Sequence, residues 1–383
     1  MASAIINGKN VFFEPGMTIL QAARTAGIYI PVLCEHPALE VAGACRICLV
    51  EVENNPKLQT ACSTPIMDGM VIDTESEKVR AARKAVIELL LIRHPLDCFS
   101  CSSNGKCELQ SIAYDLGIEK SPFCEEGDTC RDYELDDSNP FYVRDLNKCI
   151  LCGLCVRACD EVMGVGALGL VKRGFDTVVM PALEQPLSET GCISCGQCVS
   201  VCPTGALQEN LTLEKSVPLD TEATDTTCAY CSVGCSMHLE TYGDMLVKAV
   251  PDREGAVNKG LLCGRGKFGF DCSVMDGKLL EPMARKDGEL TEVDYHEAFM
   301  LTAKKAESLA AKYGRNAVAV AVSDRYTNEE AYVIKKFADS IGAKTLCFNN
   351  RENGLEKVLG VNASPNTINE VLSADVILCA GFI

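Results

Sequence analysis

The 24 cysteines of this 383-residue chain are the residues most able to do chemistry. Most stand two or three residues apart, too close to pair comfortably with each other and well suited to grip one metal centre. Two runs share one spacing, 43 residues apart: CILCGLCVRAC from Cys149 and CISCGQCVSVCP from Cys192. This spacing holds pairs of [4Fe–4S] cubes, the fourth cysteine of each run ligating the other cube. We therefore predict a first cube site of Cys149, Cys152, Cys155 and Cys202, and a second cube site of Cys192, Cys195, Cys198 and Cys159.

Four other cysteines are spread more widely and form what we call the two-iron site: Cys34, Cys45, Cys48 and Cys62. One precedes a loop, two lie in it, and one stands on a later strand. A loop of this kind wraps a flat [2Fe–2S] rhomb, although the plant-type spacing has a shorter first gap. Structural zinc is the alternative, since four spread cysteines can also make a tetrahedral site. We expect the nearby His36 to be structural.

A further group has three close thiols and one remote one. This split site consists of Cys228, Cys231, Cys235 and Cys263. Zinc usually takes two Cys-x2-Cys pairs, so the asymmetric spacing here favours a [4Fe–4S] cube. The same argument disfavours zinc at the two cube sites, where four cysteines fall within eleven residues.

One of the four histidines, His94, lies just ahead of three close cysteines that lack a fourth partner. Pro95 disfavours helical geometry at His94, so a preceding helix should stop there and leave the ring free to turn. A neutral imidazole ligand in place of a negative thiolate should raise the potential of a cluster. The alternative is a histidine that interacts with a helix dipole. The histidine site is then His94, Cys98, Cys101 and Cys107.

The composition limits the partners and the cellular compartment that we expect for these centres. A net charge of −17 argues against nucleic acid and anionic membrane as partners. Apolar content of 47% and charged content of 23% are ordinary for a globular protein. The N-terminus has no signal-like pattern, and no stretch approaches roughly 18 consecutive apolar residues. We therefore expect a reduced, cytoplasmic chain without membrane insertion, rather than a disulfide scaffold.

The elements that position the cysteines can also be predicted. Residues 1–75 indicate a small α/β unit, with a hairpin at Asn7-Gly8 and a short helix between Thr18 and Gly27. Residues 78–93 have the apolar spacing of a helix, and 98–145 are expected to be irregular. From about 290 helices and strands alternate (296–313, 316–322, 327–341, 344–348, 366–373, 375–381), which indicates a parallel, doubly wound sheet.

A glycine motif at 164–169, GVGALG, fits the dinucleotide pattern, with Glu184 twenty residues beyond its first glycine. Such a fingerprint must follow a strand and open a helix. Here it follows a cysteine-bearing segment and leads into a strand-like stretch. We therefore expect nicotinamide and flavin to bind to partner subunits.

The two-iron site followed by the histidine site resembles the large iron–sulfur subunit of respiratory complex I. The order of the two-iron and histidine sites also occurs in the electron-input regions of NAD-linked formate dehydrogenase α-subunits and of [FeFe]-hydrogenases. In that family the histidine is a cluster ligand, so the resemblance implies the same for His94. The complete double run at 149–202 is similar to the formate dehydrogenase and hydrogenase branch. The split site with the following GRGKFGFD resembles the opening of a molybdopterin oxidoreductase domain.

The resemblance implies an α+β multi-domain chain in five parts. These are a β-grasp [2Fe–2S] ferredoxin-like domain (1–77), a [4Fe–4S] domain with one histidine and three cysteine ligands (78–118), an acidic connector (119–145), a two-[4Fe–4S] ferredoxin domain (146–215), and a molybdopterin-oxidoreductase-like [4Fe–4S] domain with a truncated α/β region (222–383).

Three departures lower the expectation of formate chemistry. In the loop where formate dehydrogenases carry a cysteine or selenocysteine, this chain reads KTLCFNNRENGLEKV; Cys347 belongs to the strand, and Arg351 or Glu352 falls nearer the loop. Arg265 stands where many dehydrogenases place a lysine between cluster and pterin, so it is expected beside the last cluster. The sequence ends at Ile383, where the family's molybdenum domain continues, which implies a remnant domain or the front part of a longer chain.

The expected function is an electron wire with one [2Fe–2S] and four [4Fe–4S] clusters, no catalytic residue, and no flavin, NAD or molybdopterin on this chain. It would serve a hetero-oligomeric NAD(P)H-linked oxidoreductase of the bifurcating transhydrogenase, hydrogenase or formate dehydrogenase type. Its expected partners are a flavin-bearing diaphorase-type subunit, a small [2Fe–2S] subunit and ferredoxin. The alternative is the N-terminal portion of a molybdenum or tungsten NAD-dependent formate dehydrogenase.

Overall fold

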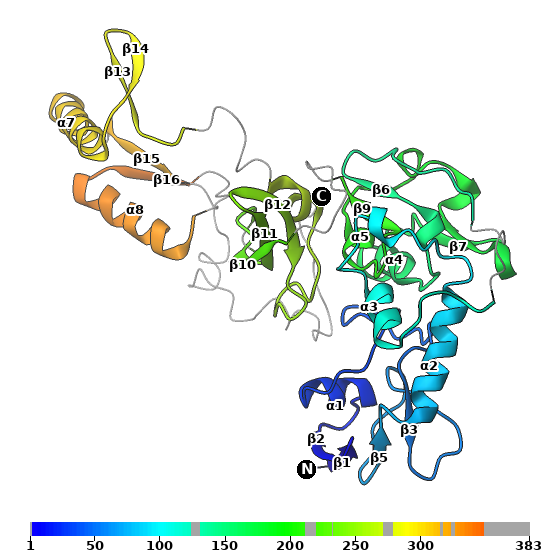
Figure 1. Cartoon of the computed structure of the whole chain (residues 1–383). Helices are drawn as coiled ribbons and strands as arrows, with labels where there is room; N and C mark the ends of the chain where they lie inside the picture. The colour runs from blue at the N-terminus through cyan, green and yellow to red at the C-terminus, as the bar shows by residue number, and fades with distance from the viewer. Residues whose placement is uncertain are drawn as a thin grey trace. The chain divides into compact units, whose positions relative to one another are not determined.

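The computed structural model describes residues 2–123, 131–210, 220–231, 233–270, 279–314, 317–322 and 326–347, with 344–347 described by their backbone (Figure 1). It divides into a first unit of Met1–Thr224 and His238–Phe268 and a second unit of Asp225–Met237 and Gly269–Ile383. The predicted helix 366–373 and strand 375–381 lie outside the described residues. So do Arg351 and Glu352.

The first unit begins with a five-stranded sheet that carries the two-iron site. Its strands are β1 (Ala2–Ile6), β2 (Lys9–Phe13), β3 (Leu49–Val52), β4 (Gln59–Thr60) and β5 (Val71–Asp73), in the order β2-β1-β5-β3-β4. β1 and β5 run parallel, and the other neighbours are antiparallel. The predicted hairpin is confirmed, because Asn7 and Gly8 have φ values of 50° and 76°, as a two-residue turn requires.

Helix α1 (Ile19–Thr25) packs on this sheet through Ile19, Leu20, Ala22 and Ala23. Thr18 and Gln21 form a capping box at its start, and Gly27 follows its end at a φ of 70°, so the predicted helix signals are confirmed. The amides of Ile19 and Leu20 donate to the carbonyls of Thr64 and Ala61, at 3.0 and 2.9 Å. The helix therefore holds the loop that contains Cys62.

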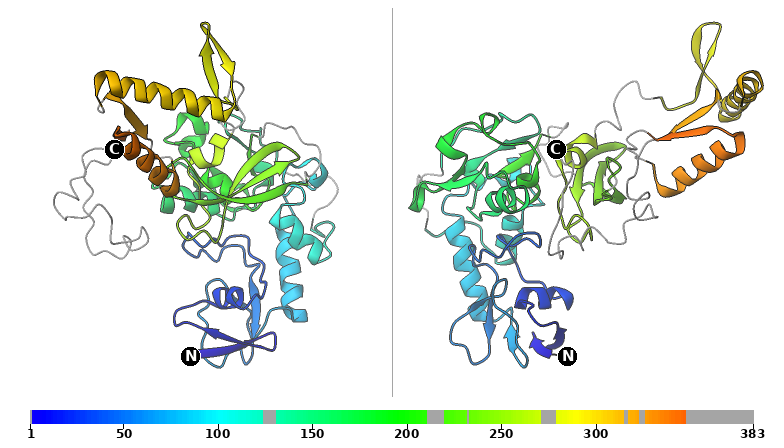
Figure 2. Two further views of the ribbon diagram at one scale, coloured as in Figure 1. Left: turned by 90° about the vertical axis from the view of Figure 1, so that its left-hand side faces the viewer. Right: turned by 180° about the vertical axis from the view of Figure 1, so that it is seen from behind.

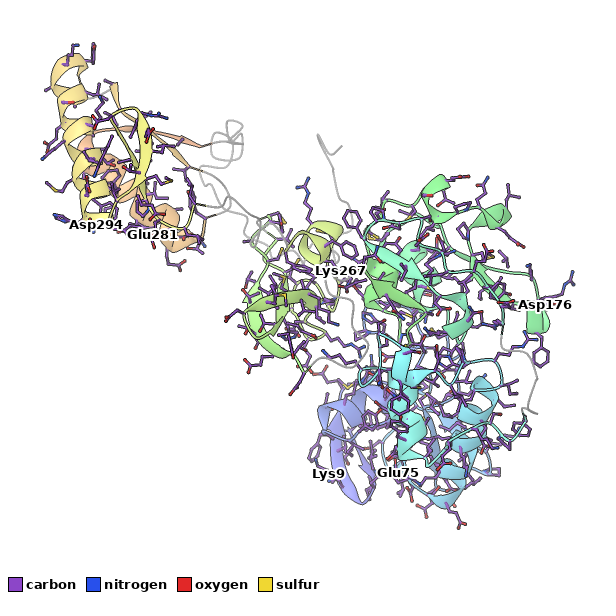
Figure 3. All side chains as sticks on the ribbon, turned by 45° about the horizontal axis from the view of Figure 1, so that its top comes forward. Lys9, Glu75, Asp176, Lys267, Glu281 and Asp294 are labelled. Atoms are coloured by element: carbon purple, nitrogen blue, oxygen red, sulfur yellow. The ribbon has the colours of Figure 1, made fainter. Side chains whose placement is uncertain are left out.

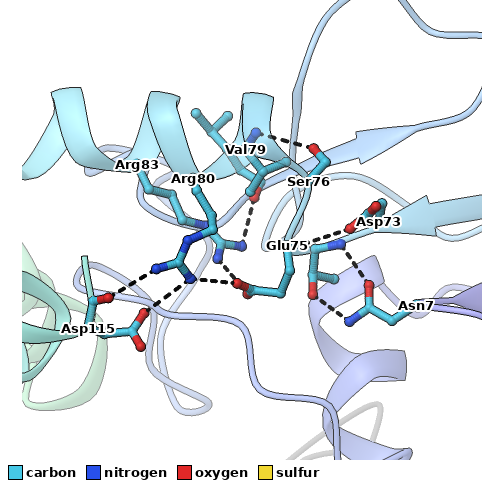
Figure 4. Close-up of polar contacts among 10 residues, drawn as sticks. Asn7, Asp73, Glu75, Ser76, Val79, Arg80, Arg83 and Asp115 are labelled. Atoms are coloured by element: carbon cyan, nitrogen blue, oxygen red, sulfur yellow. Dashed lines mark hydrogen bonds and ion pairs between the residues drawn. The ribbon is translucent and has the colours of Figure 1, made fainter. Parts of the chain in front are cut away.

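Helix α2 (Glu77–Leu90) connects the sheet to the histidine site. Ser76 caps it, and Glu75 accepts from Arg80 and Arg83 at 3.1 Å each (Figure 4). Arg80 also donates to the carbonyl of Asp115 at 3.0 Å. The helix ends at Leu90, four residues before the stop predicted at His94, so His94 lies in the loop that follows.

The prediction of irregular structure over 98–145 was wrong at two places. Helix α3 (Glu108–Asp115) begins directly after Cys107 and buries Leu109, Ile112 and Ala113. Strand β6 (Tyr142–Arg144) pairs with β9 (Leu207–Glu209), beyond the second cysteine run. A single 3₁₀ turn, η1 (Cys98–Ser100), lies among the cysteines of the histidine site.

The two cysteine runs form matching halves. After η2 (Leu146–Lys148), the first run leads into helix α4 (Leu154–Arg157) and the π-helical turn η3 (Ala158–Val162), and the second leads into α5 (Gln197–Ser200). In both halves the residue two after the first cysteine is left-handed, with a φ of 57° at Leu151 and 53° at Ser194. A glycine with a φ of 75°, Gly153 or Gly196, then starts each helix.

Between the halves lie β7 (Gly169–Val171) and β8 (Val178–Met180), which pair, and the turns η4 (Gly174–Asp176), η5 (Ala182–Glu184) and η6 (Leu187–Glu189). The glycine motif at 164–169 follows the helical turn η3 and leads into β7. This is the reverse of the order that a dinucleotide fingerprint needs.

After the second run, β10 (Glu222–Thr227), β11 (Ser236–Tyr242) and β12 (Met245–Pro251) form a three-stranded sheet in that order. The short helix α6 (Gly264–Phe268) follows Cys263.

The second unit contains a hairpin of β13 (Met283–Lys286) and β14 (Glu289–Glu292), then α7 (Tyr295–Tyr313), β15 (Ala319–Val322), α8 (Asn328–Ile341) and β16 (Lys344–Cys347). Both views of Figure 2 show the hairpin beside α7, and Lys286 of the hairpin pairs with Glu297 of α7 at 2.7 Å. β15 and β16 are parallel. The predicted alternation is therefore confirmed as far as β16.

Candidate iron–sulfur centres

The two-iron site brings its four thiols together as two pairs. The sulfur atoms of Cys48 and Cys62 lie 3.4 Å apart. Cys45 donates its backbone amide to the sulfur of Cys34 at 3.3 Å. The amide of Ala61 reaches the carbonyl of Cys48 at 3.0 Å, which closes the loop around the second pair.

Paired thiols fit a rhomb, because each of its two irons takes two thiolates. The neighbouring thiols of Cys45 and Cys62 lower the pKa of Cys34 and of Cys48, which favours the thiolate form of one thiol in each pair. Among the described residues, no three His, Cys, Asp or Glu side chains converge closely enough to share one metal ion.

The histidine site is assembled around an open cavity. His94, Cys98 and Cys107 line it, with Leu91, Leu96 and Phe99 among the apolar neighbours. Cys101 does not line this cavity; its sulfur faces the loop after the second run, 2.7 Å from the position that a Cβ on Gly205 would take. Burial, followed by the charge of Cys101, raises the pKa of Cys98. The structure therefore brings three predicted ligands to one cavity and the fourth to its neighbourhood.

His94 is prepared to act as a neutral ligand. Burial lowers its pKa to about 4, so the ring carries a lone pair at neutral pH. Its Nδ1 atom is buried and has no hydrogen-bond partner among the described residues. Buried polar atoms without a partner are uncommon, and a bound metal would supply one.

Each cube site lines its own small cavity, and the crossed assignment of the fourth cysteines fits both. Cys149, Cys152, Cys155 and Cys202 line one cavity together with Arg144, Val179 and Leu207. Cys159, Cys192, Cys195 and Cys198 line the other together with Tyr142, Ala167 and Leu187.

Backbone amides already point at several of these sulfurs. The amides of Leu151 and Ser194 donate to Cys149 and Cys192 at 3.4 Å, in matching places of the two halves. The amide of Ala167 donates to Cys159 at 3.3 Å. Burial raises the pKa of Cys152 and of Cys198 to about 12 each, so these thiolates need a positive partner. The irons of a cluster would provide it.

The split site is only partly described by the structure. Cys228, Cys231 and Cys235 lie in the second unit, where the amide of Cys228 donates to the carbonyl of Cys235 at 2.9 Å. Cys263 lies in the first unit and is exposed. The joint site therefore stays a sequence prediction. Arg265, predicted beside the last cluster, is an exposed residue of α6.

Three of the sites meet around the first cube site. Glu108, next to Cys107, donates its amide to the carbonyl of Pro203, next to Cys202, at 3.1 Å. Arg157 of α4 donates to the carbonyl of Cys34 at 2.7 Å. Leu33 and Ile47 of the two-iron loop share a core with Cys107 and Ile112. Adjacent sites are thus linked through backbone and packed side chains.

The segment around Cys263 packs against the second cube site. Gln197 donates to the carbonyl of Leu262 at 2.7 Å. A Cβ on Gly264 would lie 3.1 Å from the carbonyl oxygen of Ser194. Lys267, labelled in Figure 3, is 2% exposed and pairs with Glu209 at 2.6 Å. The close approach of Gly264 to the carbonyl of Ser194 leaves little room for a larger residue at position 264.

Sequence reasoning missed the non-cysteine residues around the clusters. Tyr142 and Arg144 lie on a strand within the stretch predicted to be irregular, and Lys267 lies two residues beyond Arg265. A Tyr-x-Arg triplet or a single lysine carries no spacing signal of its own, whereas repeated cysteines do. His36 is buried, and its Nδ1 accepts from the amide of Ala38 at 3.2 Å, in agreement with the structural role expected of it.

Family models match successive parts of the chain. They are a 2Fe-2S iron-sulfur cluster binding domain (2–77), an NADH-ubiquinone oxidoreductase-G iron-sulfur binding region (83–122), a 4Fe-4S dicluster domain (148–206), a molybdopterin oxidoreductase Fe4S4 domain (221–273) and a molybdopterin oxidoreductase domain (278–382). The chain therefore carries both 2Fe–2S and 4Fe–4S binding domains, in the predicted order.

Curated relatives extend beyond this chain. The alpha subunit of the NADPH-Fe(3+) oxidoreductase of Geobacter sulfurreducens is 33% identical over 100% of the chain and 45% of the relative. The G 2 subunit of the NADH-quinone oxidoreductase of Rhizobium meliloti is 36% identical over 89% of the chain and 39% of the relative. The chain thus spans less than half the length of these proteins.

A solved structure is also similar to part of this chain. A chain in the crystal structure of an NAD+-reducing [NiFe]-hydrogenase in the H2-reduced state is 32% identical with a TM-score of 0.52, over 57% of this chain and 91% of that one. No helix among the described residues is long and apolar enough to span a membrane. The chain is therefore similar to subunits of oxidoreductases, and successive parts of it match iron–sulfur domain models.

Proposed function

We propose that the chain relays single electrons between a flavin-bearing, NAD(P)H-oxidising partner subunit and a second redox module or ferredoxin. The observation that carries this proposal is the arrangement of the sites in the first unit. The two-iron site, the histidine site and the second cube site each contact the segments that hold the first cube site. Separate sites in contact suit successive one-electron transfers.

The proposed complement is one [2Fe–2S] and four [4Fe–4S] clusters, held by the five ligand sets predicted from the sequence. When bound, the clusters accept and release electrons. The protein orders them and adjusts their potentials through ligand type, burial and hydrogen bonds to sulfur. His94 contributes the neutral ligand of its cluster. Arg265 follows Cys263, a proposed ligand of the last cluster, by two residues in the chain.

We further propose that the chain works in the cytoplasm as part of a hetero-oligomer with diaphorase-type and small [2Fe–2S] subunits. No disulfide bond links its described cysteines, which suits a reducing compartment. Nicotinamide and flavin belong to the partners in this proposal.

Metal analysis tests the proposal. A fully loaded chain should contain about 18 iron atoms, two from the rhomb and four from each of four cubes. Redox-titrated EPR should then resolve a [2Fe–2S] signal beside several [4Fe–4S] signals, and the chain should co-purify with a flavin-bearing subunit. An iron content near two per chain, or stoichiometric zinc in its place, would contradict the proposal.

A second candidate is a molybdenum or tungsten formate dehydrogenase, of which this chain is the N-terminal portion. The observation in its favour is the match of residues 278–382 to a molybdopterin oxidoreductase domain. Molybdenum or tungsten analysis of the natural full-length protein separates the two. Near-stoichiometric molybdenum or tungsten with formate oxidation supports the second candidate, and iron alone supports the first.

A further inference from the structure

Strand β6 carries two hydrogen-bond donors that address different cube sites. Tyr142 and Arg144 are two residues apart, so their side chains leave the same face of the strand. Tyr142 lines the cavity of the second cube site, and Arg144 lines that of the first. Both are almost completely buried, at 1% and 3% exposure.

Arg144 lines the first cavity and has an uncommitted donor. Its Nε donates to the carboxylate of Asp136 at 2.8 Å, which fixes the guanidinium. Its Nη1 is buried and has no partner among the described residues. A buried charged donor left unpaired costs more than about 1–3 kcal/mol. The sulfides and thiolates of a cube on the surrounding cysteines are the acceptors that this cavity would offer.

Tyr142 is committed to a ligand of the other site. Its hydroxyl lies 3.4 Å from the sulfur of Cys192, and Phe268 stacks on its ring with centroids 6.2 Å apart. A phenol is protonated at neutral pH, so this hydroxyl would donate to the thiolate of a ligating Cys192. In the first cube site the hydroxyl of Thr204 donates to the carbonyl of Lys148 at 2.9 Å and lies 3.8 Å from the sulfur of Cys202.

We infer that β6 sets the potentials of the two cubes separately, Arg144 raising that of the first cube and Tyr142 raising that of the second. This inference rests on the proposed function, since it requires both cubes. Reduction adds one electron and one negative charge to a cube, so a donor aimed at its sulfur stabilises the reduced form more. A charged donor acts more strongly than a neutral one. Arg144 therefore gives the first cube the larger increase.

The inference gives the first cube a role as the junction of the wire. Its segments touch the two-iron loop through Arg157 and the histidine site through Pro203. An electron that arrives from either side is held at the junction by the cation beside it. Arg144 thus places a positive charge beside the first cube, although it lies outside every cysteine motif.

The test is an EPR-monitored redox titration of the full chain with all clusters loaded. Arg144→Met should lower the first cube's potential. Asp136→Asn, which removes the counter-charge of the guanidinium, should raise the same potential. Tyr142→Phe should lower only the second cube's potential. Tyr242→Phe, which removes an exposed hydroxyl on β11, is the matched control and should change neither. Cys152→Ala identifies the first cube, because its signal disappears.

For Arg144→Met we expect about a tenfold change in the one-electron equilibrium of the first cube, equal to 59 mV. The inference is overturned if iron content and both signals are preserved but the variants change the potential of neither cube, or change the potentials of both cubes equally. If Arg144→Met does not assemble, Asp136→Asn decides alone, and an unchanged or lowered potential overturns the inference. Loss of the cube signals already in the unmodified chain would instead refute the proposed function.

Discussion

A single imidazole among thiolates changes the electrostatics of its cluster, and His94 offers the cleanest test of this. Replacing His94 by Cys should preserve the iron content, because a fourth ligand remains. It should lower the potential of that cluster by on the order of 100 mV, because a negative ligand replaces a neutral one. A redox titration followed by EPR measures both. His94→Ala should lose the cluster, and an unchanged potential in His94→Cys would remove the histidine from the ligand set.

Two glycines in matching places allow a second test at the residue scale. Gly196 and Gly153 both have a φ of 75°, but only at Gly196 would a Cβ clash, 2.5 Å from the ring of Phe268. Gly196→Ala should therefore destabilise the loaded protein by about 3 kcal/mol, from backbone strain and overpacking together. Gly153→Ala, with nothing within 4 Å, should cost only the strain, about 1–2 kcal/mol.

The comparison is made by thermal unfolding of the loaded protein, with near-equal losses contradicting the packing argument. If Gly196→Ala is the worse of the two, the contact between α6 and the second cube site is needed in solution as well.

At the scale of elements, α2 carries the chain from the sheet to the histidine site, and Arg83 fastens it. Arg83 is 3% exposed; it pairs with Glu75 and donates to the carbonyl of Leu49 on β3 at 2.9 Å. Arg83→Met should cost about 2 kcal/mol, because the part-buried carbonyl of Leu49 loses its donor. Arg80→Met, at an exposed pair with the same Glu75, should cost less than about 1 kcal/mol. Denaturant unfolding measures the difference, and equal costs would contradict the role given to burial.

The elements also show how far sequence reasoning reaches. The hairpin at Asn7-Gly8 and the helices after Thr18 and Thr327 were predictable, because their turn and cap signals are local and the structure contains each capping box. The crossed cysteine assignment was also predictable, because the two runs repeat one spacing, and the cavity linings match it. Helix α3 was missed although Leu109, Ile112 and Ala113 have helical spacing.

Tertiary context decides the remainder. Nothing in the sequence near Tyr142 and Arg144 states that they face two different cavities, because this depends on β6 pairing with β9, 65 residues away along the chain from Tyr142 to Leu207. The Nη1 atom of Arg144 becomes informative only once its surroundings are known. Residues around a cluster therefore need the fold, whereas its ligands can be recognised by spacing.

At the scale of the molecule, the parts should depend on metal to different degrees. The five-stranded sheet has an extensive apolar core, whereas the two-cube region has helices of four residues and paired strands of three. Removing iron with a chelator should therefore unfold 146–210 while 2–73 stay folded. Limited proteolysis with mass mapping should show early cleavage only within residues 146–210. Simultaneous cleavage of both would contradict this difference.

The junction at the first cube site implies a kinetic dependence on Arg157. Its guanidinium donates to the carbonyls of Cys34 and Glu40 from α4, a helix that begins between Cys152 and Cys155. Arg157→Met should slow electron equilibration between the two-iron site and the cubes several-fold, because the two-iron loop is held less closely. Iron content should stay the same. Arg24→Met, which breaks the pair with Glu35 on the same loop, is the control. Flash reduction followed optically measures the rate, and equal slowing in both variants would show a general loosening of the loop rather than a route through α4.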